Sequence, residues 1–244
     1  MQLVRPQKPI EYPDGDGNPM AENTLQFEWI VTIKENLETL FAERADVFVA
    51  GDLLWYPAQG HPEIRLAPDA LVAFGRPKGY RGSYMQWVEE GIAPQIVFEV
   101  LSPGNRPSEM TRKFKFYEHY GVDEYYIYDP DHNELTGWLR QGAELQEIPS
   151  MDGWTSPRLG IRFERGDVLT IRNPDGSPFL SAEKLFKKCD RLNQEREQAE
   201  RDLQLANWER DKAVTEKAAL EGIVAQQAAD LAQLRARLES RTDA

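Results

Sequence analysis

The sequence predicts a mixed α/β domain with a central β-sheet flanked by helices, followed by a long C-terminal coiled-coil helix. Two observations predict this class. In residues 22–185, short runs rich in β-branched and aromatic residues alternate with two segments whose apolar residues recur at helical spacing. In residues 186–244, proline is absent and apolar residues recur in steps of four and three, as in a coiled coil.

The composition limits the kinds of partner. The chain has 244 residues, of which 41% are hydrophobic, so a sizeable core can form. Its formal net charge is −12, and residues 190–244 contribute only −3 of it, from 12 acidic and 9 basic residues. Most of the excess acid therefore lies in the globular part, which argues against binding to nucleic acid by bulk charge. A nucleic-acid partner would need a local basic face.

The sequence predicts a cytoplasmic protein with no membrane segment. The single cysteine, Cys189, cannot form an internal disulfide, and the scattered histidines give no zinc-binding spacing. The first 20 residues contain no apolar core of a signal peptide. No stretch approaches the roughly 18 consecutive apolar residues that mark a membrane span.

Turn residues and helical spacing define the first elements. Residues 1–21 are dominated by Pro, Gly and Asp and lack periodicity, so we expect a disordered or loosely ordered arm. A helix is predicted to begin at Asn23 or Thr24, because the apolar residues from Phe27 to Phe41 recur at helical spacing.

Strand-like runs follow this helix. Segment 47–57 predicts one or two strands, segment 67–75 a short strand entered through a proline, and segment 96–101 an apolar strand. Residues 76–94 are predicted to form a loop or a short helix.

A second helix and a β meander complete the predicted domain. The helix is expected from about Ser108, as its cap, to Tyr120, with Gly121 at its end. A strand at 124–130 and a hairpin at 134–148 follow, and further short strands come after them.

Residues 186–244 are predicted to form a coiled coil that joins two copies of the chain as a homodimer. Fourteen seam positions, ten of them apolar, follow one another in steps of four and three. They are Leu192, Arg196, Ala199, Leu203, Ala206, Arg210, Ala213, Lys217, Leu220, Val224, Gln227, Leu231, Leu234 and Leu238. The pairing can be parallel or antiparallel, and a helix folded back on its own domain is the alternative.

One acidic residue lies within an apolar strand. Glu99 interrupts the run Ile96–Val100, and a buried carboxylate is costly unless it is paired or coordinates a metal. Asp69 stands at the start of another predicted strand, and Lys113 lies on the helix that follows Glu99. These three side chains can meet at one end of a sheet. Such oxygen ligands suit Mg²⁺ or Mn²⁺, and a nearby lysine can orient water or stabilise charge during phosphodiester hydrolysis.

Two strings, "PDALVAFG" and "PQIVFEVLSPGNRPSEMTRKFKFYEHYGVDEYYIYDP", resemble the Uma-type endonuclease family of the PD-(D/E)XK restriction-endonuclease-like superfamily. The resemblance covers roughly residues 22–185 and leaves out the coiled-coil tail. It implies a restriction-endonuclease-like fold and Mg²⁺-dependent cleavage of DNA. Asp69 and Glu99 match the family's metal-binding acids, and the Val100 carbonyl is implied as a further ligand. Lys113 matches the helix lysine of the family.

The chain departs from the superfamily pattern at two positions. The lysine usually found two residues after the acid is replaced by Leu101, so Lys113 is the candidate. The acid of the first helix has no direct match. The accessory candidates are Glu28, Glu35, Glu109 and Lys115. The candidates for nucleic-acid contacts are Arg76, Lys78 and Arg81 in "GRPKGYRG" and Arg112 on the second helix. A solvated loop is an equally good interpretation of "GRPKGYRG".

The leading hypothesis is a Mg²⁺-dependent DNA endonuclease in which Asp69 and Glu99 bind metal and Lys113 assists the reaction. The alternative is a catalytically inactive nuclease-fold protein that works in binding or assembly through its coiled coil. The acidic globular part favours the alternative, whereas the presence of all three site residues favours the enzyme. A metal-dependent hydrolase of another phosphoester is a third interpretation.

Overall fold

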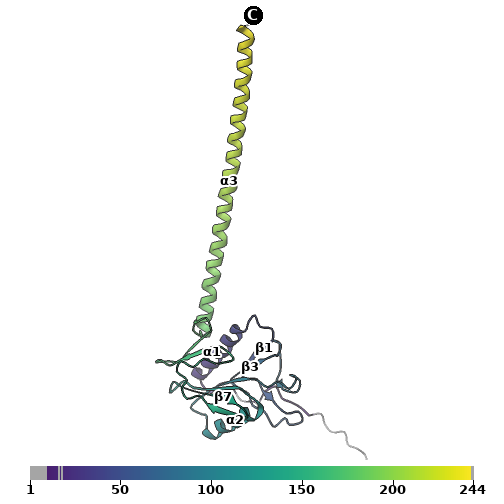
Figure 1. The fold of residues 1–244 in the computed structure, drawn as a ribbon, viewed down its shortest axis with the longest axis vertical. Helices are drawn as coiled ribbons and strands as arrows, with labels where there is room; N and C mark the ends of the chain where they lie inside the picture. The colour runs from purple at the N-terminus through teal and green to yellow at the C-terminus, as the bar shows by residue number, and fades with distance from the viewer. Residues whose placement is uncertain (1–9, 16, 18, 243–244) are drawn as a thin grey trace, which may run out of the picture. The chain divides into compact units, whose positions relative to one another are not determined.

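The structure of the protein is a computed structural model that describes residues 10–15, 17 and 19–242, with side chains described as far as residue 233. The chain divides into a globular unit, Met1–Leu185, and a helical unit, Phe186–Ala244. Figure 1 shows the sheet and helices of the first unit and the long helix of the second.

The globular unit is built on a six-stranded sheet. Its strands lie in the order β1–β3–β5–β6–β7–β8. They are β1 (Val47–Ala50), β3 (Ala70–Phe74), β5 (Ile96–Val100), β6 (Glu124–Asp129), β7 (Glu134–Gln141) and β8 (Glu144–Glu147). Neighbours are antiparallel except for β5 and β6, which run parallel. The mixed central sheet predicted from the sequence is therefore confirmed.

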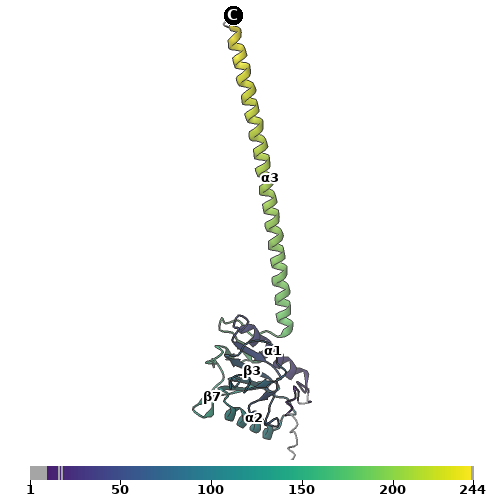
Figure 2. The same cartoon turned by 90° about the vertical axis from the view of Figure 1, so that its right-hand side faces the viewer.

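Two helices cover the two faces of this sheet, as Figure 2 shows. Helix α1 (Thr24–Leu40) packs in the hydrophobic cluster that contains Phe98, and α2 (Pro107–Tyr120) packs in the cluster that contains Val97. Successive residues of a strand point to opposite faces. Glu99, the next residue along β5, therefore faces α2.

The ends of both helices follow from their capping residues. The Asn23 side chain accepts a hydrogen bond from the backbone N–H of Gln26 at 2.8 Å, which confirms the predicted start of α1. Helix α2 begins at Pro107, one residue before the predicted cap, because the fixed φ of proline suits the first helical position. It ends at Gly121, whose φ of 98° is left-handed, as predicted.

Four short strands lie outside the central sheet. β2 (Trp55–Tyr56) pairs in parallel with β4 (Tyr84–Met85), and β9 (Arg162–Glu164) pairs in an antiparallel manner with β10 (Thr170–Arg172). β4 falls in the segment that the sequence predicts as loop or short helix. A two-residue strand is too short to leave an alternating pattern, so the sequence carries no signal for it.

The described part of the N-terminal arm is anchored to the globular unit. The Tyr12 ring lies 5.2 Å from the Tyr56 ring and 5.0 Å from the Trp87 ring, measured between centroids. The Tyr56 hydroxyl donates a hydrogen bond to the Pro13 carbonyl at 2.7 Å. Composition predicts a loosely ordered segment, and it gives no signal for these contacts of Tyr12 and Pro13. Residues 1–9 lie outside the described part of the chain.

The helical unit is one uninterrupted helix, α3 (Ala182–Thr242). Its large apolar seam residues are exposed by 53% to 63%. These are Leu192, Leu203, Leu220, Val224 and Leu231. The last two predicted seam residues, Leu234 and Leu238, lie outside the residues whose side chains are described. Among the helices that the structure describes, none is both long and apolar enough to cross a membrane.

Candidate metal centre

The antiparallel pairing of β3 and β5 brings Asp69 next to the end of β5. Ala70 lies opposite Phe98, so the residue before β3 reaches the last residues of β5. The backbone N–H of Val100 donates a hydrogen bond to Oδ2 of Asp69 at 2.6 Å. This bond holds the Asp69 carboxylate beside the strand that carries Glu99.

Glu99 is satisfied by two donors from one face of α2. Its side chain is only 2% exposed. Nζ of Lys113 donates to Glu99 Oε2 at 2.7 Å, and the Tyr117 hydroxyl donates to Oε1 at 2.5 Å. The two donors are four residues apart and therefore lie one above the other on the helix. A buried carboxylate is stable in this apolar strand because both its oxygens are paired.

The electrostatics of the cluster indicate excess negative charge. Burial raises the pKa of the Asp69 carboxyl well above its ordinary value, and the nearby Glu99 raises it further, against the opposing effects of Lys113 and the Val100 N–H. For Lys113, burial lowers the pKa, but the attraction of Glu99 and Asp69 outweighs it, so the net pKa is raised. Lys113 therefore stays cationic, and a second cation would relieve the strain on Asp69.

The donors at this edge of the sheet suit a sparsely coordinated Mg²⁺ or Mn²⁺ ion. In the described part of the chain, no three Asp, Glu, His or Cys side chains are grouped to hold a metal. The candidate ligands are two carboxylates, from Asp69 and Glu99, and the carbonyl of Val100. That carbonyl accepts a hydrogen bond from Nε2 of Gln26 at 2.8 Å and keeps a second lone pair. Three hard oxygens are the type of ligand that Mg²⁺ prefers, and Mg²⁺ completes its coordination with water.

The first-helix residue that reaches the site is Gln26, which the sequence did not single out. Gln26 is 6% exposed, whereas Glu28 is exposed and Glu35 forms an ion pair with Lys34 at 3.0 Å. The two acidic candidates therefore do not join the cluster. Helical spacing could have indicated that Gln26 is buried, because it stands four residues before Ile30 and therefore lies on the same buried stripe of α1.

Two tyrosines behind Glu99 were also missed. Tyr117 and Tyr125 are fully buried, with ring centroids 5.0 Å apart. The Tyr125 hydroxyl is buried without a hydrogen-bond partner among the described residues. Burial raises the pKa of Tyr125, and Glu99 and Asp69 raise it further. Tyr125 is thus a neutral neighbour of the cluster that makes no hydrogen bond to it.

The accessory residues of α2 separate into two groups. Glu109 and Arg112 line a pocket of about 850 Å³ that also contains Lys113, with Arg65 among its other lining residues. Lys115 is exposed, and its position two residues from Lys113 places it on another side of the helix. The structure therefore brings Glu109 and Arg112 near the site and leaves Lys115 outside it.

The basic loop lies at the other end of β3. Arg76 and Arg81 follow the end of that strand, whereas Asp69 precedes its start. Nε of Arg76 lies 2.9 Å from Glu89, and Nε of Arg81 lies 2.6 Å from the same carboxylate. Arg81 also stacks over the Phe48 ring at 3.9 Å. These contacts hold both arginines within the domain, which argues against a solvated loop as well as against phosphate binding.

Lys78 of the same loop is exposed. It follows β3 as the two arginines do and is therefore also distant from Asp69 along the strand.

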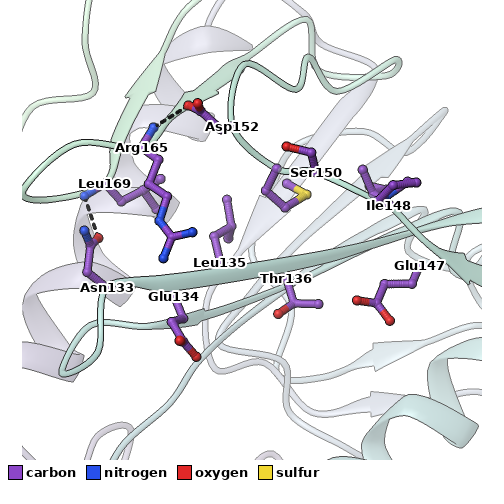
Figure 3. Close-up of a pocket in the computed structure, with 12 residues that line it drawn as sticks. Asn133, Glu134, Leu135, Thr136, Glu147, Ile148, Ser150, Asp152, Arg165 and Leu169 are labelled. Carbon is purple, nitrogen blue, oxygen red and sulfur yellow. Dashed lines mark hydrogen bonds between the residues drawn. The ribbon is translucent and has the colours of Figure 1, made fainter.

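A separate pocket of about 290 Å³ lies by β7 and β8, shown in Figure 3. Its lining includes Ile148 and Met151, which belong to the α1-side cluster. Its polar side chains include Glu134, Asp152 and Arg165. None of the site residues predicted from the sequence is among the residues that line this pocket.

Three comparisons with known proteins gave a family match, a similar solved structure and no curated relative. One similar solved structure is titled "Crystal structure of a putative nuclease belonging to DUF820 from Anabaena variabilis", with 14% identity and a TM-score of 0.44, covering 57% of this chain and 75% of that chain. No curated protein matches the chain. The sequence profile of the family described as "Uma2: Putative restriction endonuclease" matches residues 1–171. Because this match spans well over half of the sequence, the chain belongs to the Uma2 family.

Proposed function

We propose that the protein is a Mg²⁺- or Mn²⁺-dependent endonuclease that hydrolyses phosphodiester bonds in DNA. The observation that carries this proposal is the meeting of Asp69, Glu99 and Lys113 at one edge of the sheet. Two acids and one base in a buried cluster are the side chains that metal-assisted phosphodiester hydrolysis needs. Membership of the Uma2 family supports the same reaction class.

Each residue has a distinct proposed role. Asp69, Glu99 and the carbonyl of Val100 hold the metal ion, with Asp69 oriented by the Val100 N–H. The bound ion would polarise the phosphoryl oxygen and lower the pKa of the attacking water. Lys113 orients that water or stabilises the negative charge of the transition state. Tyr117 keeps Glu99 in place from behind.

The pocket beside Lys113 is the proposed entry for the DNA backbone. Arg65 and Arg112 add two positive charges to that of Lys113 in its lining, and Glu11, Glu63 and Glu109 supply three negative ones. The three bases and three acids balance, so the pocket has no excess positive charge, and phosphate contacts there would depend on the individual basic side chains. Binding through so few basic residues should be weak and should depend only modestly on salt, because the salt dependence scales with the number of phosphates contacted.

Plasmid cleavage tests this function. Supercoiled plasmid is incubated with the protein and Mg²⁺ or Mn²⁺, with EDTA as the metal-free control. We expect the wild-type protein to nick or linearise the plasmid, and Glu99→Gln and Lys113→Ala to lose at least about tenfold in rate. Lys115→Ala is the matched control, because it removes a lysine from the same helix outside the cluster, and it should keep full activity. Equal cleavage by wild type and Glu99→Gln would sink the proposal.

One observation favours a non-catalytic binding or assembly protein as the second candidate. Both oxygens of Glu99 already have donors, Lys113 and Tyr117, so this carboxylate is satisfied without any ion. The two candidates differ in their response to metal. A non-catalytic protein would keep the same melting temperature across millimolar Mg²⁺ and would leave plasmid intact, whereas the nuclease should be stabilised by the ion it binds.

A further inference from the structure

The seam of α3 carries large apolar side chains that are exposed along the part of the helix whose side chains are described. Its apolar members stand on one stripe, and the described large ones are exposed by 53% to 63%. A helix of this length with apolar residues at heptad spacing is characteristic of a coiled coil. The charges beside the stripe indicate which partner covers it and in which direction.

Every base in the seam directly follows an acid. The three pairs are Glu195–Arg196, Glu209–Arg210 and Glu216–Lys217. In heptad terms, with Leu192 at position d, each base occupies an a position and each acid the preceding g position. In a parallel two-stranded coil, an a side chain inserts into a hole that includes the partner's preceding g residue. Each base of one chain would therefore meet the acid of the other.

The same bases already pair with acids of their own helix. Arg196 lies 3.7 Å from Glu200, and Lys217 lies 3.8 Å from Glu221, each pair four residues apart. Glu200 and Glu221 are e positions, so a parallel in-register pair would place them opposite the partner's g acids. At these two layers like charges would face each other, and at both a base stands between them. In this register, a base therefore lies beside each pair of facing acids and offsets their repulsion.

Antiparallel pairing offers no such balance. It would bring g positions of the two chains together along one side of the coil. Five of the six g positions from residue 195 to residue 230 are acidic. They are Glu195, Asp202, Glu209, Glu216 and Asp230. A row of facing acids would repel, so the charge pattern disfavours this arrangement.

We propose that the occupant of the seam is a second copy of this chain, paired in parallel and in register along α3. Apolar layers hold the two helices together. At the layers of Arg196 and Lys217, each base would lie between an acid of its own helix and an acid of the partner, which favours this partner and this register. Since the globular unit precedes α3 in the sequence, this pairing tethers two globular units to the same end of the coil.

Disulfide formation by Cys189, the only cysteine of the chain, distinguishes parallel from antiparallel pairing. Cys189 is exposed and lies three residues before Leu192, which places it at an a position of the same heptad register. In the parallel coil each Cys189 faces its counterpart, within the roughly 7 Å between Cα atoms that a disulfide allows. In an antiparallel coil the two cysteines would be tens of ångströms apart, because α3 rises about 1.5 Å per residue.

The test combines sedimentation with mild oxidation of the full-length protein. We expect a dimer by analytical ultracentrifugation at micromolar concentration, and a disulfide-linked dimer on a non-reducing gel after oxidation. Cys189→Ser combined with Gln194→Cys moves the thiol to an outward-facing f position and should give no linked dimer. Leu220→Asp with Leu231→Asp should give a monomer, because each change puts an unpaired charge into the seam.

Charge reversal separates the proposed register from simple apolar association. Glu209→Lys with Glu216→Lys should weaken the dimer by about tenfold or more at low salt, because it sets like charges against the partner's bases. Glu197→Lys with Asp211→Lys makes the same charge change at outward b positions and should have little effect. A monomeric full-length chain would overturn the proposal. A dimer that does not link through Cys189, or one equally weakened by both charge reversals, would overturn it as well.

Discussion

Tyr117→Phe removes one hydroxyl from behind Glu99 and leaves the ring in place. The ring packs in parallel with Trp55 at a centroid distance of 6.3 Å, and phenylalanine can keep this packing. The lost contact is the 2.5 Å hydrogen bond to Glu99 Oε1. Because Glu99 is 2% exposed, water cannot easily replace the missing donor. The substitution therefore tests whether the cluster depends on this bond.

The expected loss of stability is about 2–3 kcal/mol, the cost of leaving a buried charged acceptor unsatisfied. For a domain of this size, each kcal/mol shifts the melting temperature by about 2–4 °C. Tyr117→Phe should therefore melt about 5–10 °C below the wild type in EDTA. Calorimetry and urea unfolding followed by circular dichroism measure the two quantities independently.

Tyr125→Phe is the matched control for this prediction. Tyr125 is equally buried and adjoins Tyr117, but its hydroxyl has no partner among the described residues. Removing it should leave stability unchanged or raise it by up to about 1 kcal/mol. If the two variants lost the same stability, or if Tyr117→Phe lost none, the reasoning about Glu99 would be refuted.

Three further predictions concern the charged groups. In EDTA, Lys113→Ala should lose about 3–5 kcal/mol in urea unfolding because it leaves buried acids without a cation, whereas Lys115→Ala should stay within about 0.5 kcal/mol. Because the pKa of Asp69 is raised in the native state, the native protein keeps a proton that the unfolded chain releases near pH 4. The free energy of unfolding of the metal-free protein should therefore fall as the pH rises from about 4 through the native pKa of Asp69. Asp69→Asn should flatten this fall, and a wild-type profile identical to that of Asp69→Asn would contradict it. Arg81→Ala should cost about 2–4 kcal/mol through its lost contacts with Glu89, while DNA affinity measured by fluorescence anisotropy stays unchanged; a drop in affinity would restore the phosphate-binding interpretation.

The sequence predicted the main elements because their signals are local. The apolar runs at 70–74 and 96–100 became β3 and β5, and the stripe after Asn23 became α1. Glu99 could be singled out because a carboxylate in an apolar strand demands a partner. Lys113 lies on the next helix, and its match to the helix lysine of the Uma-type family set it apart from Lys115. The elements and Glu99 needed only periodicity and the cost of burying charge.

The remaining features depend on tertiary contacts that periodicity does not encode. Gln26 reaches Val100 across 74 positions of the sequence, and a neutral amide in a buried stripe gives a weaker signal than an acid. The partnership of Arg76 and Arg81 with Glu89 was equally hidden, because a basic loop has the same composition whether its charges are solvated or paired. Tyr12 anchors a segment whose overall composition predicts little order.

Binding of Mn²⁺ tests whether Asp69 and Glu99 hold a divalent ion between them, as we propose. Electron paramagnetic resonance of free Mn²⁺, titrated with wild-type protein, measures the number of bound ions and their affinity without requiring catalysis. We predict one bound Mn²⁺ per chain, competed by Mg²⁺, and a loss of at least about tenfold in affinity in both Asp69→Asn and Glu99→Gln. Binding that is absent in the wild type, or unchanged in the two variants, would contradict the account.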